Sequence, residues 1–484
     1  MTSTGLVVIP LAFLIIMLPW RFGIIALLVF ATLDSAAVVN VGSFGLQPGY
    51  FFGSLMIART ALEIVVLVLP LNAHVVRMLT PLLLFTIICF ISIWVGLSFF
   101  QGQVLVVSST AGFNLDLAQP YTFQRQNLTQ PFYLILNVGI VYALAHQIAR
   151  LPAGKVRPTL DRAVVGAILF ASFVATWEMA HFYFGLPFAT DFFHSNAGYY
   201  KAHGQILFAS ILRVSGPFSE PSNLAYFFAA FLMYAWYRYL RRPGTGAMAV
   251  VLLCLTMLAA STSTTAFAVL GIFALVLVKD MVVKLATGPA RTTLSMHHVG
   301  SGVLIGLALL GVLTFAQSYS HEIHGVFTSM VLEKQQTSSF AQRSGADMIA
   351  LDILLQTGGI GIGLGSHKPN NLAMTLLSNT GIAGFLVFAI FLYGLFRPRL
   401  AESPDVDVRS YLWMVVGLLS VHLISNPNLN PIILWIGFAL IVGARTAAEQ
   451  TAANRRSDPT PALPGTPTAT APGFWQPHGT TTLR

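Results

Sequence analysis

The sequence predicts an all-α protein, a polytopic bundle of transmembrane helices with about twelve spans. Hydrophobic residues make up 55% of its 484 residues and charged residues only 9%, and the mean hydropathy is +0.74. A soluble chain has roughly a quarter of its residues charged. Apolar runs near the length that crosses a bilayer, about 20 residues, also recur along the chain. Lipid is therefore expected to surround most of this protein.

Each expected helix corresponds to one apolar run. The candidate spans are residues 51–68, 79–99, 131–148, 164–184, 224–240, 247–260, 266–283, 303–316, 372–396, 411–425 and 432–442. The stretch 5–39 is interrupted by Pro19, Trp20 and Arg21, so it forms either one broken span or a pair of short ones. Twelve spans would place both termini on the same side of the membrane.

Lysine and arginine gather in five short segments that fall on one side under this alternation, namely 150–162, 238–242, 279–291, 397–409 and 445–456. Basic loops mark the cytoplasmic side of a membrane protein. The net charge of +9 therefore reports topology, and no basic stripe with interleaved aromatic residues predicts a nucleic-acid partner. We expect a multi-pass protein of the bacterial inner membrane.

The same alternation places three longer segments, 101–129, 191–221 and 317–370, in the periplasm. Residues 1–445 form one transmembrane domain, in which 317–370 is the main periplasmic loop before the last three spans. Residues 446–484 are rich in proline, threonine and alanine, and this composition predicts a disordered cytoplasmic tail.

The segment 213–221 places a cation and a carboxylate just before a candidate span. Arg213 precedes Gly216, and Glu220 precedes Pro221, a residue favoured in the first helical turn. A helix N-terminus attracts anions, and the arginine fork fits phosphate. The segment predicts an anion site, with a plain helix cap and an interfacial arginine as the alternative.

A second cation lies in the loop 338–345, which contains Arg343 and leads through an amphipathic run to glycines between 358 and 365. No strand–helix unit surrounds these glycines, which argues against a nucleotide-binding loop. Glycines at alternate positions instead allow the backbone to approach a ligand or a neighbouring helix closely.

His367 and Lys368 follow the glycines, and Gly381 and Gly384 lie one helical turn apart further on, where they permit close helix packing. His367 is a candidate general base and Lys368 a candidate phosphate ligand. The alternative for His367 is an exposed histidine beside a turn-forming proline.

Other polar residues are weaker candidates. Glu178 and His181, spaced i, i+3 at the expected outer end of their span, are candidates for a supporting role. Arg59 and Glu63 are spaced i, i+4 and are sufficiently explained as an ion pair within one helix. The sequence shows no cluster of residues at metal-binding spacing, so no metal site is expected.

Together these motifs resemble the O-antigen ligase/polymerase superfamily, which contains the Wzy-type polysaccharide polymerases and the WaaL-type ligases. The ligase pattern has a histidine, then asparagine, serine or glutamine, then nine residues and Gly-x-x-Gly. Asn371, the nine-residue gap, Gly381 and Gly384 match this pattern, whereas Asn370 occupies the histidine position. This departure favours a polymerase.

The resemblance implies inverting glycosyl transfer at the periplasmic face without a metal or cofactor. Donor and acceptor are glycans linked to undecaprenyl pyrophosphate, and a chain-length regulator and a flippase are expected partners. By resemblance Arg213, Arg343 and Lys368 bind the pyrophosphate, Glu220 or His367 is the base, and Asn370, Asn371, Glu178 and His181 give support. The alternatives are an O-antigen ligase and a transporter of lipid-linked oligosaccharides.

Overall fold

The computed structural model describes residues 1–108, 115–198, 206–207, 211–263, 266, 268–275, 278–279, 338–397 and 408–457. Within these ranges the chain is mostly helical, as the sequence predicts. Six of the described helices are long and apolar enough to cross a membrane. They are α3 (Pro48–Val66), α4 (Ala73–Phe99), α5 (Gln126–Ala149), α6 (Ala153–Phe184), α14 (Leu372–Phe396) and α16 (Ile432–Ser457).

Shorter or more polar helices complete the described bundle. They are α1 (Ser3–Met17), α2 (Trp20–Ala31), α7 (Thr190–Phe193), α8 (Pro221–Arg241), α9 (Thr245–Ala260), α13 (Ser338–Gln356) and α15 (Val408–Ile424). A 3₁₀ turn spans Leu115–Leu117. Three antiparallel pairs join β1 (Val39–Val41) to β2 (Phe44–Leu46), β3 (Leu105–Val106) to β4 (Gln119–Pro120), and β5 (Ile206–Leu207) to β6 (Ile211–Leu212).

The N-terminal stretch folds as two short helices, α1 and α2. Arg59 stabilises the turn between them, since its guanidinium donates to the Leu18 carbonyl at 2.8 Å and lies 4.3 Å from the Trp20 ring centroid. Glu63 accepts from Trp20 Nε1 at 2.9 Å and pairs with Arg59 at 3.0 Å. The expected ion pair therefore exists and also caps a neighbouring helix.

The described helices alternate between two ends of the bundle. At the first, which we call the basic end, Asp161 accepts from Tyr234 at 2.6 Å and lies 3.6 Å from Arg157 and 3.4 Å from Arg238. The basic segments 150–162 and 238–242 meet here, and Arg445 donates to the carbonyls of Gly394 and Arg397, which joins two more. Residues 280–291 lie outside the described ranges. The chain begins at the other end, because the Thr2 N–H donates to the Val38 carbonyl at 3.3 Å, whereas α16 ends at the basic end. The twelve-span arrangement with both termini on one side is therefore not what the structure shows.

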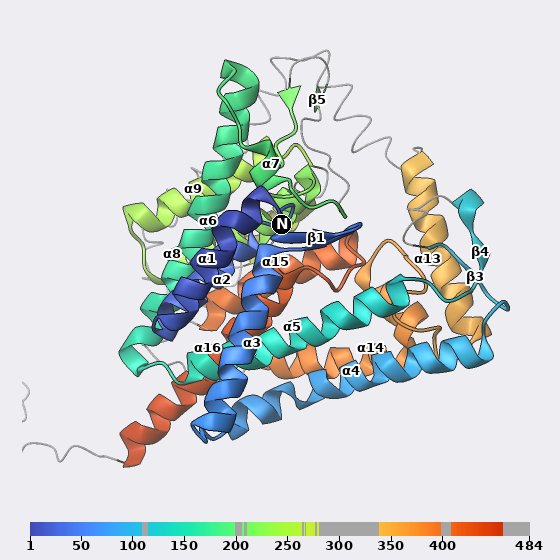
Figure 1. Cartoon of the computed structure of the whole chain (residues 1–484), viewed down its shortest axis with the longest axis horizontal. Coiled ribbons are helices and arrows are strands. Elements are labelled where there is room, and N and C mark those ends of the chain that lie inside the picture. The colour runs from blue at the N-terminus through green and yellow to red at the C-terminus, as the bar shows by residue number, and fades with distance from the viewer. Residues whose placement is uncertain are drawn as a thin grey trace, which may run out of the picture.

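That other end, which we call the site end, carries the loops and small strands. Helices α4, α5 and α14 run side by side toward it, and α13 lies there next to the β3–β4 pair (Figure 1). Helix α8 starts at the site end and packs between α9 and α15, buried along most of its length. It therefore holds the segment before it against the centre of the bundle.

Three sequence expectations require adjustment. Residues 338–345, expected as a loop, form the first turns of α13. Helix α16 continues to Ser457, so residues 446–457 of the expected tail are helical. Gly381 has non-helical angles (φ 68°, ψ −173°) and breaks α14 where close helix packing was expected. The candidate span 303–316, residues 317–337 of the main loop and residues 458–484 lie outside the described ranges.

Candidate functional site

Four charged side chains from three separate segments lie at the site end, within electrostatic range of one or more of the others. Glu220 interacts electrostatically with both Arg213 and Lys368, and Arg343 interacts with Lys368. Burial lowers the pKa of Lys368 and of Arg213; Glu220 opposes this shift for both, whereas Arg343 adds to it for Lys368. The sequence analysis predicted each of these residues as a site candidate, and the fold places them at the same end of the bundle.

Glu220 is the N-cap residue of α8, with extended backbone angles (φ −143°, ψ 153°), and Pro221 opens the helix as predicted. Its carboxylate does not cap the helix. Instead, Glu220 Oε2 accepts a hydrogen bond of 3.0 Å from the Ser222 hydroxyl. The carboxylate is half-buried and therefore remains available for chemistry beside the two cations.

Glu178, near the end of α6, holds the turn that follows Arg213. Its carboxylate accepts from the Ser215 N–H at 2.9 Å, from the Ser215 hydroxyl at 2.9 Å and from the Gly216 N–H at 2.6 Å. The side chain is buried, and Gly216 adopts a positive φ of 57° to make the turn. Glu178 thus positions the segment that carries Arg213 and Glu220.

His181 lies one turn further along α6 but serves another contact. Its Nδ1 lies 2.6 Å from the Leu186 carbonyl, and its ring stacks on Phe188 with centroids 6.0 Å apart. His181 therefore stabilises the turn after α6. It stays close enough to Glu178 to interact with that carboxylate electrostatically.

His367 is buried and uses both ring nitrogens in hydrogen bonds. Its Nδ1 accepts from the Val107 N–H at 3.1 Å, so Nε2 carries the proton and donates to the Ala346 carbonyl at 2.9 Å. Burial lowers its pKa from 6.5 to about 4. His367 therefore ties the end of β3 to α13 as a neutral imidazole.

Asp347 fixes α13 to the loop that follows Lys368. It accepts from the Asn370 N–H at 2.8 Å and from Asn371 Nδ2 at 3.0 Å. Asn371 also caps α14, because its Oδ1 accepts from the Met374 N–H at 3.0 Å. Burial raises the pKa of Asp347, and the bonds from the two asparagines oppose that rise. Arg343 precedes Asp347 by one helical turn, and this contact holds it near enough to Lys368 for the two cations to interact electrostatically.

The glycine-rich loop packs against backbone, which supports the expectation of close approach. A Cβ at Gly363 would lie 2.6 Å from Ile93 Cα, and one at Gly365 would lie 2.4 Å from the Gln126 carbonyl oxygen. Asn379 of α14 completes this packing, since its Oδ1 accepts from the His367 N–H at 2.9 Å. Sequence reasoning missed Asn379, whose only signal was an amide in an apolar run two residues before Gly381.

Asp34, in the loop after α2, also reaches the site. The neighbouring Ser35 N–H donates to the Pro217 carbonyl at 3.2 Å, inside the segment held by Glu178. Gln47 Nε2 donates to Asp34 Oδ1 at 2.9 Å. Burial raises the pKa of Asp34 to about 6; the Gln47 bond opposes this rise, and Glu220 contributes to it.

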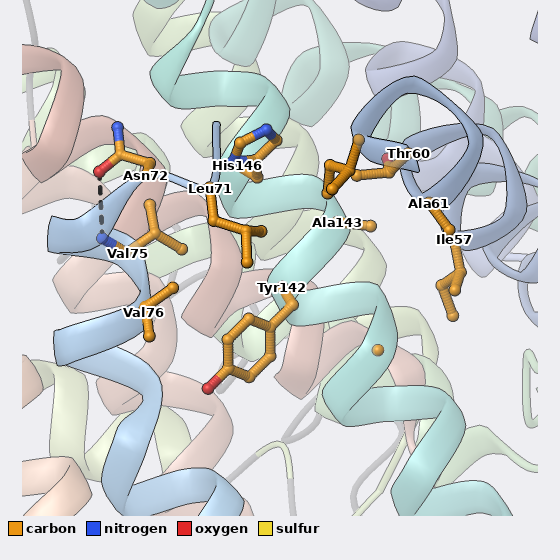
Figure 2. A pocket seen from close by; sticks show the side chains of 12 residues that line it. Ile57, Thr60, Ala61, Leu71, Asn72, Val75, Val76, Tyr142, Ala143 and His146 are labelled. Atoms are coloured by element: carbon orange, nitrogen blue, oxygen red, sulfur yellow. Dashed lines mark hydrogen bonds between the residues drawn. The ribbon is translucent and has the colours of Figure 1, made fainter. Parts of the chain in front are cut away.

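A separate cavity of about 200 Å³ lies between α3, the start of α4 and the second half of α5. Figure 2 shows that most side chains around it are apolar; the polar residues Thr60, Asn72 and His146 also line it. Because α4 starts and α5 ends at the basic end, this cavity lies in the other half of the bundle and does not belong to the site.

The arrangement suits an anion with more than one negative charge. Three cations and one carboxylate, from three segments of the chain, lie within electrostatic range of one or more of the others. Within the described ranges, no group of three histidine, cysteine, aspartate or glutamate side chains is placed to hold a metal ion. Comparison with protein-family models, curated proteins and solved structures finds no match for the chain.

Proposed function

We propose that this chain is a membrane glycosyltransferase that polymerises oligosaccharide repeat units linked to undecaprenyl pyrophosphate, forming exopolysaccharide or O-antigen. In this proposal it has about twelve spans, lies in the bacterial inner membrane, and presents the site end to the periplasm. The observation that carries the proposal is that Glu220 interacts electrostatically with both Arg213 and Lys368, and that Lys368 also interacts with Arg343.

The chemistry follows from the charges of these groups. The leaving group is a lipid diphosphate, already a stable anion, so the enzyme has to stabilise negative charge more than to supply a proton. Arg213, Arg343 and Lys368 provide that stabilisation. A carboxylate then takes the proton from the attacking sugar hydroxyl.

Glu220 is the better of the two candidate bases. His367 uses both nitrogens to join backbone segments and is buried, so accepting another proton would require it to give up the bond from Val107. Glu220 is half-buried and accepts one bond from Ser222. We therefore assign the base to Glu220 and a positioning role to His367.

A polymerase fits the site better than a ligase. The residue at the ligase histidine position is Asn370, whose N–H donates to Asp347 and whose Nδ2 donates to the Ile424 carbonyl at 3.2 Å. An amide cannot act as a base near neutral pH. Asn370 therefore cannot replace the ligase histidine as base, and in this proposal Glu220 activates the acceptor hydroxyl.

The test is reconstitution of the purified full chain in lipid vesicles. Lipid-linked repeat units extracted from the source bacterium serve as substrate, and products are separated by size. A ladder of lengths supports polymerisation. Transfer of one preformed glycan to a different lipid acceptor indicates a ligase, and movement of unchanged repeat units across the bilayer indicates a transporter; either result overturns the proposal.

A further inference from the structure

Asp34 comes from a distant part of the chain but lies near enough to Glu220, the proposed base, to interact with it electrostatically. The Ser35–Pro217 main-chain bond fastens the loop after α2 to the segment that ends in Glu220. Glu220 interacts electrostatically with Asp34 as well as with Arg213 and Lys368. Glu220 is thus attracted electrostatically by Arg213 and Lys368 and repelled by a second carboxylate, Asp34.

Gln47 fixes the orientation of that second carboxylate. Its Nε2 donates to the Asp34 carbonyl at 2.6 Å and to Asp34 Oδ1 at 2.9 Å, and Gln47 itself is held as the N-cap residue of α3. No described residue donates to Asp34 Oδ2. As a residue, Asp34 is partly exposed.

Aromatic rings lie next to this pair. Tyr133 is close enough to Asp34 to interact with it electrostatically. The Tyr133 ring centroid lies 4.8 Å from that of Tyr50 and 6.1 Å from that of Phe44. Phe44 and Tyr133 are half-buried. A fixed carboxylate accepts hydrogen bonds from hydroxyl groups, and adjacent ring faces offer an apolar surface for a ligand's C–H groups.

We propose that Asp34, oriented by Gln47 and flanked by Tyr133, binds hydroxyl groups of the acceptor sugar and so positions it against Glu220. This inference rests on the proposed function. In the transfer, the acceptor hydroxyl gives its proton to Glu220 while its oxygen bonds to the donor's anomeric carbon. The bond from that carbon to the diphosphate oxygen breaks, and the electron pair leaves with the diphosphate. Asp34 makes and breaks no covalent bond.

The experiment separates acceptor binding from donor binding in the reconstituted full chain. The acceptor probe is the repeat unit on a short-chain lipid at varied concentration, and the donor-site probe is inhibition by undecaprenyl pyrophosphate. The assay runs at a pH well above the Asp34 pKa of about 6, so that the carboxylate is ionised. The variants are Asp34→Asn and Tyr133→Leu, with Asp191→Asn, an exposed aspartate of α7, as the matched control.

Asp34→Asn should raise the acceptor KM by about tenfold, the effect of one weakened charge-assisted hydrogen bond, and leave inhibition by undecaprenyl pyrophosphate unchanged. Tyr133→Leu should raise the acceptor KM less, and Asp191→Asn should change neither quantity. An unchanged acceptor KM in Asp34→Asn overturns the inference; if that variant does not fold, an unchanged KM in Tyr133→Leu does so. A wild-type chain that transfers no sugar instead overturns the proposed function.

Discussion

The carboxylate of Glu178 accepts a hydrogen bond of 2.6 Å from the Gly216 N–H, the shortest of its three contacts with the turn after Arg213. This contact connects the end of α6 to the start of the segment that carries the proposed base. The turn fixes the segment on which both Arg213 and Glu220 lie.

Glu178→Gln should therefore impair glycosyl transfer, although Glu178 acts by holding the turn and not by binding the substrate. The glutamine amide keeps one acceptor oxygen but turns an N–H₂ group toward backbone donors, so at least one bond is lost. We expect kcat to fall about tenfold and the free energy of unfolding to fall by about 2 kcal/mol. Transfer assays and thermal unfolding in detergent measure the two effects.

Glu449→Gln is the matched control, because Glu449 is half-exposed and pairs with His74 at the basic end. An exposed ion pair contributes little to stability. Equal behaviour of the two variants would show that Glu178 has no special part in positioning the site.

The glycine-rich loop gives a prediction about stability. Gly363 has a φ of 100°, and an added Cβ would lie 2.6 Å from Ile93 Cα in α4. Gly363→Ala should lower the free energy of unfolding by more than about 2 kcal/mol, because neither the backbone angle nor the neighbour can adapt cheaply. Differential scanning fluorimetry of the purified variant measures the change.

Gly394→Ala provides the comparison in the same region of sequence. Gly394 lies within α14, and a Cβ there would meet no heavy atom within 4 Å. Its melting temperature should be unchanged or slightly higher, since alanine favours a helix. If both substitutions had the same effect, the tight packing of the loop on α4 would be refuted.

His367 predicts a specific pH dependence of stability. Its folded-state pKa is lowered by burial to about 4 from an ordinary value of 6.5, so the unfolded chain binds the proton more readily. The stability that neutral His367 contributes is complete above pH 6.5 and is lost as the pH falls toward 4.

His367→Ala removes this contribution together with the bonds to Val107 and Ala346. The variant should be less stable than the wild type at neutral pH, and the difference between their melting temperatures should shrink as the pH falls from 7 toward 5. A constant difference across that range would contradict a neutral, buried imidazole.

Local chemistry made parts of this structure predictable. Helices α3 to α5 begin and end within about two turns of the apolar runs that marked them, because a bilayer requires continuous apolar segments. Helix α6 ends where expected but begins at Ala153, eleven residues before the expected span 164–184. The Glu220–Pro221 helix start was equally readable, since Pro221 suits the first helical turn.

Other features depend on tertiary contacts that no local pattern encodes. Arg343 was expected in a loop because its surroundings are weakly apolar, but the contacts of Asp347 with Asn370 and Asn371 fasten a helix there. The Ser35–Pro217 bond, which brings Asp34 to the site, joins residues more than a hundred positions apart. The hydrogen-bonding state of His367 likewise depends on two distant backbone groups.

The central claim is that cations from separate segments hold one diphosphate. Its most direct measurement is the affinity of the reconstituted chain for undecaprenyl pyrophosphate in four variants: Arg213→Ala, Arg343→Ala, the double variant, and Arg77→Ala as an exposed control at the basic end. Arg213→Ala and Arg343→Ala should each weaken binding by about 10- to 100-fold, because each removes a charge-assisted hydrogen bond. The control should bind like the wild type, and wild-type affinity in the double variant would contradict the claim.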